Sequence, residues 1–170
     1  MSTKQQTSKE YFRELQVIYY ALIAGQVIFG IVAHCLNQYG SFNSDVQIVG
    51  NIFYIVPLFV FGGSYVSNMV FRKMMSATKS IGILTEKMNA YRSALIVRYS
   101  LLEGPSFFSI IAYYLTGHLL FLALSGLIIV FFLTIIPTTE RAATDLELNL
   151  NDKQIINNPS RLIAEIENKK

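Results

Sequence analysis

All fourteen Lys and Arg residues lie on one side of a pattern of four long apolar runs, which constrains this chain more than any other feature. The connections after the first run (34–47) and after the third (116–118) contain no Lys or Arg. Because basic residues stay on the cytoplasmic face during membrane insertion, both termini and the middle loop are expected inside. The basic residues are Lys4, Lys9, Arg13, Arg72, Lys73, Lys79, Lys87, Arg92, Arg98, Arg141, Lys153, Arg161, Lys169 and Lys170.

The composition agrees with a membrane protein. The chain is 52% hydrophobic and 15% charged, which is too apolar for a soluble domain of 170 residues. The net charge of +3 is spread over the flanks of the apolar runs, so topology and anionic headgroups account for it without nucleic acid. The single cysteine excludes an internal disulfide.

The predicted fold is an all-α membrane protein with four transmembrane helices in two antiparallel hairpins. A cytoplasmic leader (1–16) precedes the transmembrane domain (17–137), and Pro57 predicts a tilt or kink in the second span. The first run has about the twenty residues that cross a hydrocarbon core of about 30 Å. The predicted spans are 17–36, 46–71, 93–116 and 119–136.

The cytoplasmic loop, 72–92, shows helical periodicity. Ile81, Leu84, Met88 and Tyr91 recur at gaps of three and four residues, so the third helix is expected to begin near Thr85, ahead of the membrane. Such an apolar stripe either packs on its own chain or binds a partner helix.

The cytoplasmic tail, 138–170, is expected to dock on this loop. Thr138 or Thr139 can cap a short helix over 140–146, after which alternating leucines (146, 148 and 150) predict an extended segment. The break at 157–159 then leads to a last helix over 161–167. The tail is too short for a separate catalytic domain.

Glu103 is the strongest candidate for chemistry. It lies ten residues into the third span, about 15 Å deep and close to the midplane, where a charged side chain costs about 3 kcal/mol on insertion scales. Pro105 cannot donate to the carbonyl of Leu101, so a free backbone acceptor lies beside the acid. Glu103 is either a proton or ion station, or an acid hydrogen-bonded between helices for packing.

Three other polar residues complete the candidate proton- or ion-binding set. Gln26 of the first span is expected at the level of Glu103 and is the best candidate for its partner. Arg98 projects from a different face of the third helix, about 140° away, and can reach the cytoplasmic interface. At that level the second span offers Asn68 as a neighbour of Arg98.

Metal, cofactor and enzyme chemistry have little support. His34, Cys35 and His118 fall at similar depth on the outer side and are weak candidates for zinc or copper ligands, without the spacing of a known metal motif. No cofactor is predicted. The chain also lacks a Gly-rich phosphate loop, a G-x-S-x-G sequence and paired carboxylates, so it is not expected to be an enzyme.

Parts of the sequence resemble two protein families. Residues 91–111, with one mid-membrane acid after a polar loop, are similar in outline to the carboxylate helix of rotor-ring proteolipids of ATP synthases, which implies an ion-carrying role for Glu103. The partner helix lacks that family's glycine repeat, and Arg98 is foreign to its pattern. The sequences at 91–96, 101–105 and 136–141 resemble a family of small bacterial four-span proteins without an established function, which implies a fold and a location.

Two functions are therefore expected for a multi-pass protein of the bacterial inner membrane. The first is a non-enzymatic membrane subunit or scaffold, whose loop (72–92) and tail meet a cytoplasmic partner. The second is a small proton- or cation-coupled transporter or channel subunit that works around Glu103. Four helices leave little room for a pathway in one copy, so the lipid-embedded chain is expected to form a homo-oligomer or join another membrane protein.

Overall fold

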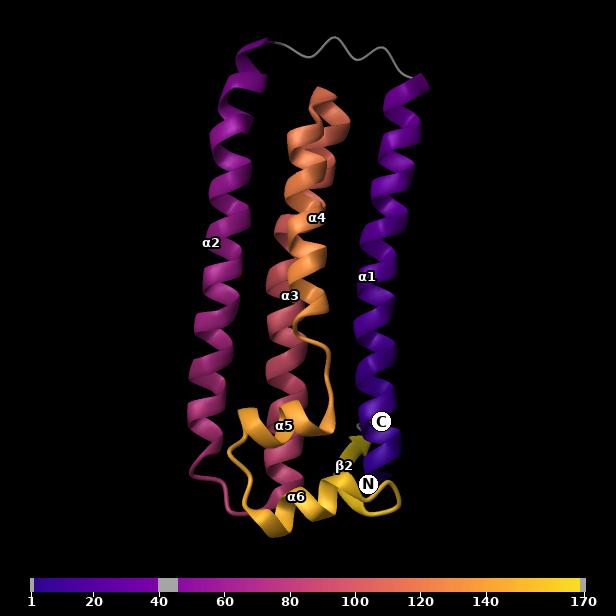
Figure 1. The fold of residues 1–170 in the computed structure, drawn as a ribbon, viewed down its shortest axis with the longest axis vertical. Helices are drawn as coiled ribbons and strands as arrows, with labels where there is room; N and C mark the ends of the chain where they lie inside the picture. Colours follow the sequence, from indigo (N-terminus) through magenta and orange to yellow (C-terminus); the bar gives the residue numbers. More distant parts are fainter. Residues whose placement is uncertain (1, 40–45, 169–170) are drawn as a thin grey trace. The chain divides into compact units, whose positions relative to one another are not determined.

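The computed structural model describes residues 2–39 and 46–168, which form helices and one pair of strands (Figure 1). Three helices exceed thirty residues: α1 (Ser8–Tyr39), α2 (Val46–Thr78) and α3 (Leu84–Thr116). The shorter elements are α4 (Leu119–Leu133), α5 (Thr139–Asp145), α6 (Leu150–Asn157), β1 (Ser2–Thr7) and β2 (Leu162–Asn168).

Within the described residues, three helices are long and apolar enough to cross a membrane: α1, α2 from Gly50 onward, and α3. Helix α4 is also apolar, but its 15 residues span about 22 Å, short of a full crossing. Helix α4 ends at Leu133, three residues before the predicted boundary at residue 136. The Thr134 hydroxyl donates to the carbonyl of Phe131 at 2.7 Å, and the residue before Pro137 is disfavoured in helical conformation.

Several predicted boundaries agree with the structure. Helix α3 begins at Leu84, and α5 is capped by Thr138, whose hydroxyl accepts from the Arg141 N–H at 3.2 Å. The turn between α3 and α4 is as tight as expected. Gly117 adopts a φ of +72°, a conformation that favours glycine.

Helix α1 begins at Ser8, within the predicted leader (1–16). Its start is fixed by a reciprocal capping box between Thr7 and Glu10. The Thr7 N–H donates to the Glu10 carboxylate at 3.1 Å, and the Glu10 N–H donates to the Thr7 hydroxyl at 3.4 Å.

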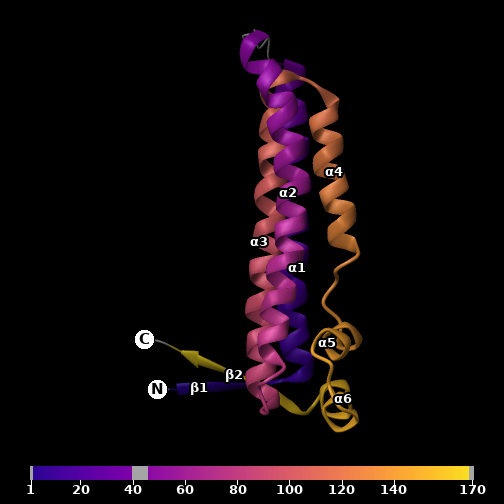
Figure 2. The ribbon, with the colours of Figure 1, turned by 90° about the vertical axis from the view of Figure 1, so that its left-hand side faces the viewer.

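The prediction of an all-α fold is wrong at the chain ends. Strands β1 and β2 pair antiparallel, with Ser2 opposite Asn168 and Gln6 opposite Ala164, and lie side by side in Figure 2. The helix predicted over 161–167 is therefore replaced by a strand. Its partner lies at the other end of the sequence, so local periodicity could not reveal the pairing.

The extended segment predicted over the alternating leucines is also wrong. Leu146 closes α5, Glu147 adopts a φ of 49°, and α6 begins at Leu150. The Asn149 side chain supplies the start signal, accepting from the Asp152 N–H at 2.7 Å. Helix α6 was not predicted, although it ends at Asn157, where the break over 157–159 was expected.

The chain divides into two compact units. The first unit comprises Met1–Tyr19, Val70–Val97 and Ile136–Lys170, and the second comprises Tyr20–Met69 and Arg98–Ile135. Helices α1, α2 and α3 are each divided, with one segment in the first unit and one in the second. Helix α4 belongs to the second unit, and α5 and α6 belong to the first.

The first unit has its own apolar core, into which the tail packs. Met88 and Tyr91 of the predicted stripe are fully buried, so this stripe packs on its own chain. Two polar contacts join the tail to the loop: the Tyr91 hydroxyl donates to the Asp145 carboxylate at 3.2 Å, and Lys79 pairs with Glu147 at 2.7 Å. The core of this unit includes Tyr11, Leu15, Met88, Tyr91, Leu95, Leu146, Leu148, Ile156 and Ile163.

Candidate functional site

Glu103 lies on α3 in the second unit, where its side chain is half-buried. One turn further on, Phe107 contacts Phe29 of α1 with ring centroids 5.3 Å apart. A further turn along, the Ile110 side chain would lie 3.9 Å from a Cβ on Gly30. Because residues three and four apart share a helix face, Glu103 lies on the side of α3 that packs on α1.

The carboxylate of Glu103 has no hydrogen bond or ion pair within residues 2–39 and 46–168. Gln26 of α1, expected as its partner, is fully buried, but its amide has no hydrogen-bond partner among the described residues either. The structure therefore does not join Glu103 to Gln26.

Pro105, two residues after the acid, packs against Gly63 of α2. A Cβ on Gly63 would lie 2.5 Å from Pro105 Cγ and 3.5 Å from the carbonyl oxygen of Leu101. The backbone acceptor that Pro105 frees thus faces Gly63 of α2. Only glycine allows this contact without a shift of the helices.

Arg98 and Asn68 are brought together on α3 and α2. Arg98 Nη2 donates to Asn68 Oδ1 at 2.6 Å, and the Ser67 hydroxyl donates to the Arg98 carbonyl at 3.0 Å. Arg98 is 6% exposed. The neutral amide of Asn68 therefore orients a buried guanidinium, and this pair lies on a different face of α3 from Glu103.

A seam of serines joins α3 to α4. The hydroxyls of Ser106 and Ser125 lie 2.8 Å apart, and Ser109 donates to the carbonyl of Phe121 at 2.5 Å. All three serines are buried. Their hydrogen bonds are satisfied within the helix pair, so the seam ties the α3–α4 hairpin together.

The weak metal candidates do not form a cluster. His34 Nδ1 lies 2.7 Å from the Tyr113 hydroxyl, and the ring of His118 packs edge-on against Phe53 at 4.8 Å. Cys35 is exposed and free. In the described part of the chain, no three His, Cys, Asp or Glu side chains are placed to hold a metal ion.

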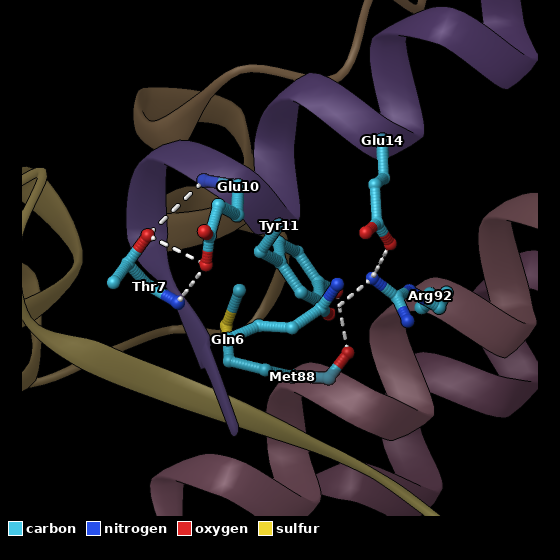
Figure 3. A network of polar contacts seen from close by, with 7 residues as sticks. All are labelled: Gln6, Thr7, Glu10, Tyr11, Glu14, Met88 and Arg92. Carbon is cyan, nitrogen blue, oxygen red and sulfur yellow. Dashed lines mark hydrogen bonds and ion pairs between the residues drawn. The ribbon is translucent and has the colours of Figure 1, made fainter. Parts of the chain in front are cut away.

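A network in the first unit was not foreseen from the sequence (Figure 3). Arg92 of α3 donates to Gln6 Oε1 at 2.7 Å, pairs with the Glu14 carboxylate at 3.2 Å, and lies 4.8 Å from the centre of the Tyr11 ring. The Tyr11 hydroxyl in turn donates to the carbonyl of Met88 at 2.5 Å. The network therefore connects β1, α1 and α3 within the first unit.

One signal in the sequence could have indicated a further feature of the second unit. Gln26, Gly30 and His34 are spaced four residues apart, which places them on one face of α1. The structure has a cavity along this face, completed by Ile110 of α3 and by Ser125 and Gly126 of α4.

Comparisons of this chain with protein-family models, with curated proteins and with solved structures gave no match.

Proposed function

We propose that the chain is a four-span protein of the bacterial inner membrane that acts as a non-enzymatic subunit or scaffold, with the first unit as its cytoplasmic binding surface. One observation supports this most strongly. The first unit contains thirteen of the fourteen basic residues, and the remaining one, Arg98, is the first residue of the α3 segment in the second unit. The boundaries between the two units therefore coincide with the boundaries between basic and non-basic parts of the chain. Basic residues gathered in one unit are expected if that unit stays on the cytoplasmic side.

The short helix α4 is compatible with this topology. Its hairpin with α3 is closed by a tight turn, and the apolar residues Ile135 and Ile136 follow its last residue. A local thinning of the bilayer, or polar side chains that reach the interface, accommodates the missing turn at a modest cost.

The single cysteine provides the test of topology. Cys35 is exposed near the C-terminal end of α1, which lies outside in the proposed topology. A membrane-impermeant maleimide should label Cys35 in intact spheroplasts. In a Cys35→Ser, Leu150→Cys variant, labelling should require permeabilised membranes. Labelling of position 150 in intact spheroplasts would rule out the proposed orientation.

The partner-binding role is tested on the surface of the first unit. Leu150 is 80% exposed, at the start of α6. A photo-crosslinking residue at position 150 should give one adduct of defined mass in native membranes, and the same residue at the exposed Asn151 should give less. A pattern of adducts that is the same at both positions would argue against a defined partner.

Deleting the tail is a poor test of this role. Leu146, Leu148, Ile156 and Ile163 are all buried in the first unit, so truncation removes part of its core. The scaffold hypothesis is better tested by substitutions at exposed positions, which leave the core intact.

The second candidate is a proton- or cation-coupled oligomer that uses Glu103. The observation that favours it is the missing partner: a packing acid needs a hydrogen bond, and the described part of one copy supplies none. Proton flux into liposomes under a pH gradient should be lost in Glu103→Gln if the acid carries protons. Flux equal to that of empty liposomes, with both proteins folded, would eliminate this candidate.

A further inference from the structure

A cavity of about 370 Å³ opens on the surface of the second unit, between α1 and the α3–α4 hairpin. It is more than twice the roughly 150 Å³ that suffices to bind benzene in an apolar protein interior. Val27 and Ile31, which are 41% and 58% exposed, border its opening. Its walls include Gln26, Gly30 and His34 of α1, Ile110 of α3, and Ser125 and Gly126 of α4.

The absence of two side chains creates this space. A Cβ on Gly126 would meet no atom within 4 Å, and one on Gly30 would meet only the side chains of Leu122 and Ile110, at 3.7 and 3.9 Å. A glycine inside a helix is less stable than alanine, because its backbone loses more conformational freedom on folding. The hollow is therefore kept open at some cost in helix stability.

Three polar residues line the cavity, and of these Gln26 is the one with unpaired side-chain atoms: Ser125 contacts Ser106, and His34 Nδ1 lies 2.7 Å from the Tyr113 hydroxyl. The Gln26 side chain is fully buried, and neither Nε2 nor Oε1 has a hydrogen-bond partner in the described part of the chain. A buried donor or acceptor that stays unpaired has lost its hydrogen bonds to water without replacement, so an occupant that pairs with both atoms is stabilised.

We propose that this cavity binds a lipid-phase carboxylic acid, a long-chain fatty acid in its neutral form, through the amide of Gln26. The acid O–H donates to Gln26 Oε1, while Gln26 Nε2–H donates to the acid carbonyl, so one ligand group satisfies both unpaired atoms. The hydrocarbon chain lies against Gly30, Ile110 and Gly126 and leaves between Val27 and Ile31. The inference rests on the membrane insertion proposed above, since the ligand enters from the bilayer.

Esters, ionised carboxylates and plain alkyl chains satisfy Gln26 less well. An ester accepts hydrogen bonds but cannot donate one, so Gln26 Oε1 stays unpaired, and an ionised carboxylate has the same defect. An alkyl chain without a polar end pairs with neither atom. Water can pair with both, but it leaves the apolar walls wet, which is unfavourable.

The test is binding of radiolabelled palmitic acid to the protein in nanodiscs of dioleoylphosphatidylcholine. We expect saturable binding that unlabelled palmitic acid displaces at least about tenfold better than methyl palmitate, the ratio expected for one lost hydrogen bond. Gln26→Leu should weaken binding by more than this factor, because both hydrogen bonds to the acid are lost. It should preserve the fold, because it removes an unpaired polar group. Gly126→Leu should abolish binding by filling the space.

Gly25→Ala is the matched control. Gly25 precedes Gln26 on α1, is absent from the cavity wall, and has nothing within 4 Å of an added Cβ, so binding should not change. Equal displacement by acid and ester, unchanged binding in Gln26→Leu, or no saturable binding to well-formed nanodiscs would each overturn the inference. A protein that fails to enter nanodiscs at all would instead overturn the membrane insertion, and this inference with it.

Discussion

Gly63 of α2 and Pro105 of α3 lie so close that a Cβ on the glycine would come within 2.5 Å of the proline Cγ. The neighbouring Gly62 has nothing within 4 Å of the same position. Two adjacent glycines in one helix therefore have different roles. Gly63 permits a close helix contact beside Glu103, and Gly62 only adds backbone freedom.

Gly63→Ala should accordingly destabilise the second unit. The proline ring is rigid, so the helices must separate, and overpacking of this kind costs about 1–3 kcal/mol. The measurement is the thermal unfolding midpoint of the purified protein in detergent. Gly62→Ala, the matched control, should raise the midpoint slightly, by up to the equivalent of about 1 kcal/mol. Equal midpoints for the two variants would contradict the close contact.

Asn68 should matter through the buried Arg98. In Asn68→Leu, the guanidinium loses the acceptor that lies 2.6 Å from Nη2, and loss of a hydrogen bond to a charged group costs about 1.5–3 kcal/mol. Asn68→Asp keeps an acceptor oxygen and adds a complementary charge, so this variant should retain most of the stability. The unfolding midpoints of both variants in detergent provide the measurement. A leucine variant as stable as the aspartate variant would show that the contact contributes little.

Tyr11→Phe should loosen the first unit. The substitution keeps the ring beside Arg92 but leaves the Met88 carbonyl without the hydroxyl that donates to it at 2.5 Å. The expected loss is about 1–3 kcal/mol, seen as faster limited proteolysis of the polar ends of the chain. Tyr54→Phe, at a residue that is 81% exposed, should leave the proteolysis rate unchanged.

The sequence predicted α1 to α5 because their signals are local. It did not predict α6, because the alternating leucines favoured an extended segment. Apolar runs, the stripe through Met88 and Tyr91, and Thr138 as a cap each depend on residues within a few turns of one another. The strand pair could not be predicted in this way. Gln6 and Ala164 are partners from opposite ends of the chain, and no local pattern announces such a pairing.

The candidate site was only partly predictable for a similar reason. The proximity of Arg98 to Asn68 follows from counting residues along antiparallel helices. The rotation of each helix about its axis does not. In the structure the Gln26 amide is not paired with Glu103, and Gln26 instead lines a cavity. The small size of Gly126 leaves room for this cavity.

The tail should prove to be part of the core of the first unit rather than an appendage. Leu146 is 4% exposed and Leu150 is 80% exposed, although both are leucines in the same polar segment. Leu146→Ala should cost about 2–5 kcal/mol through the cavity it leaves, whereas Leu150→Ala should stay within about 0.5 kcal/mol of wild type. Hydrogen exchange of the amides in α5 and α6 gives the comparison, because a loosened core exposes them. If both variants exchange like wild type, the tail does not depend on Leu146 for its packing, and truncation becomes a fair test of partner binding.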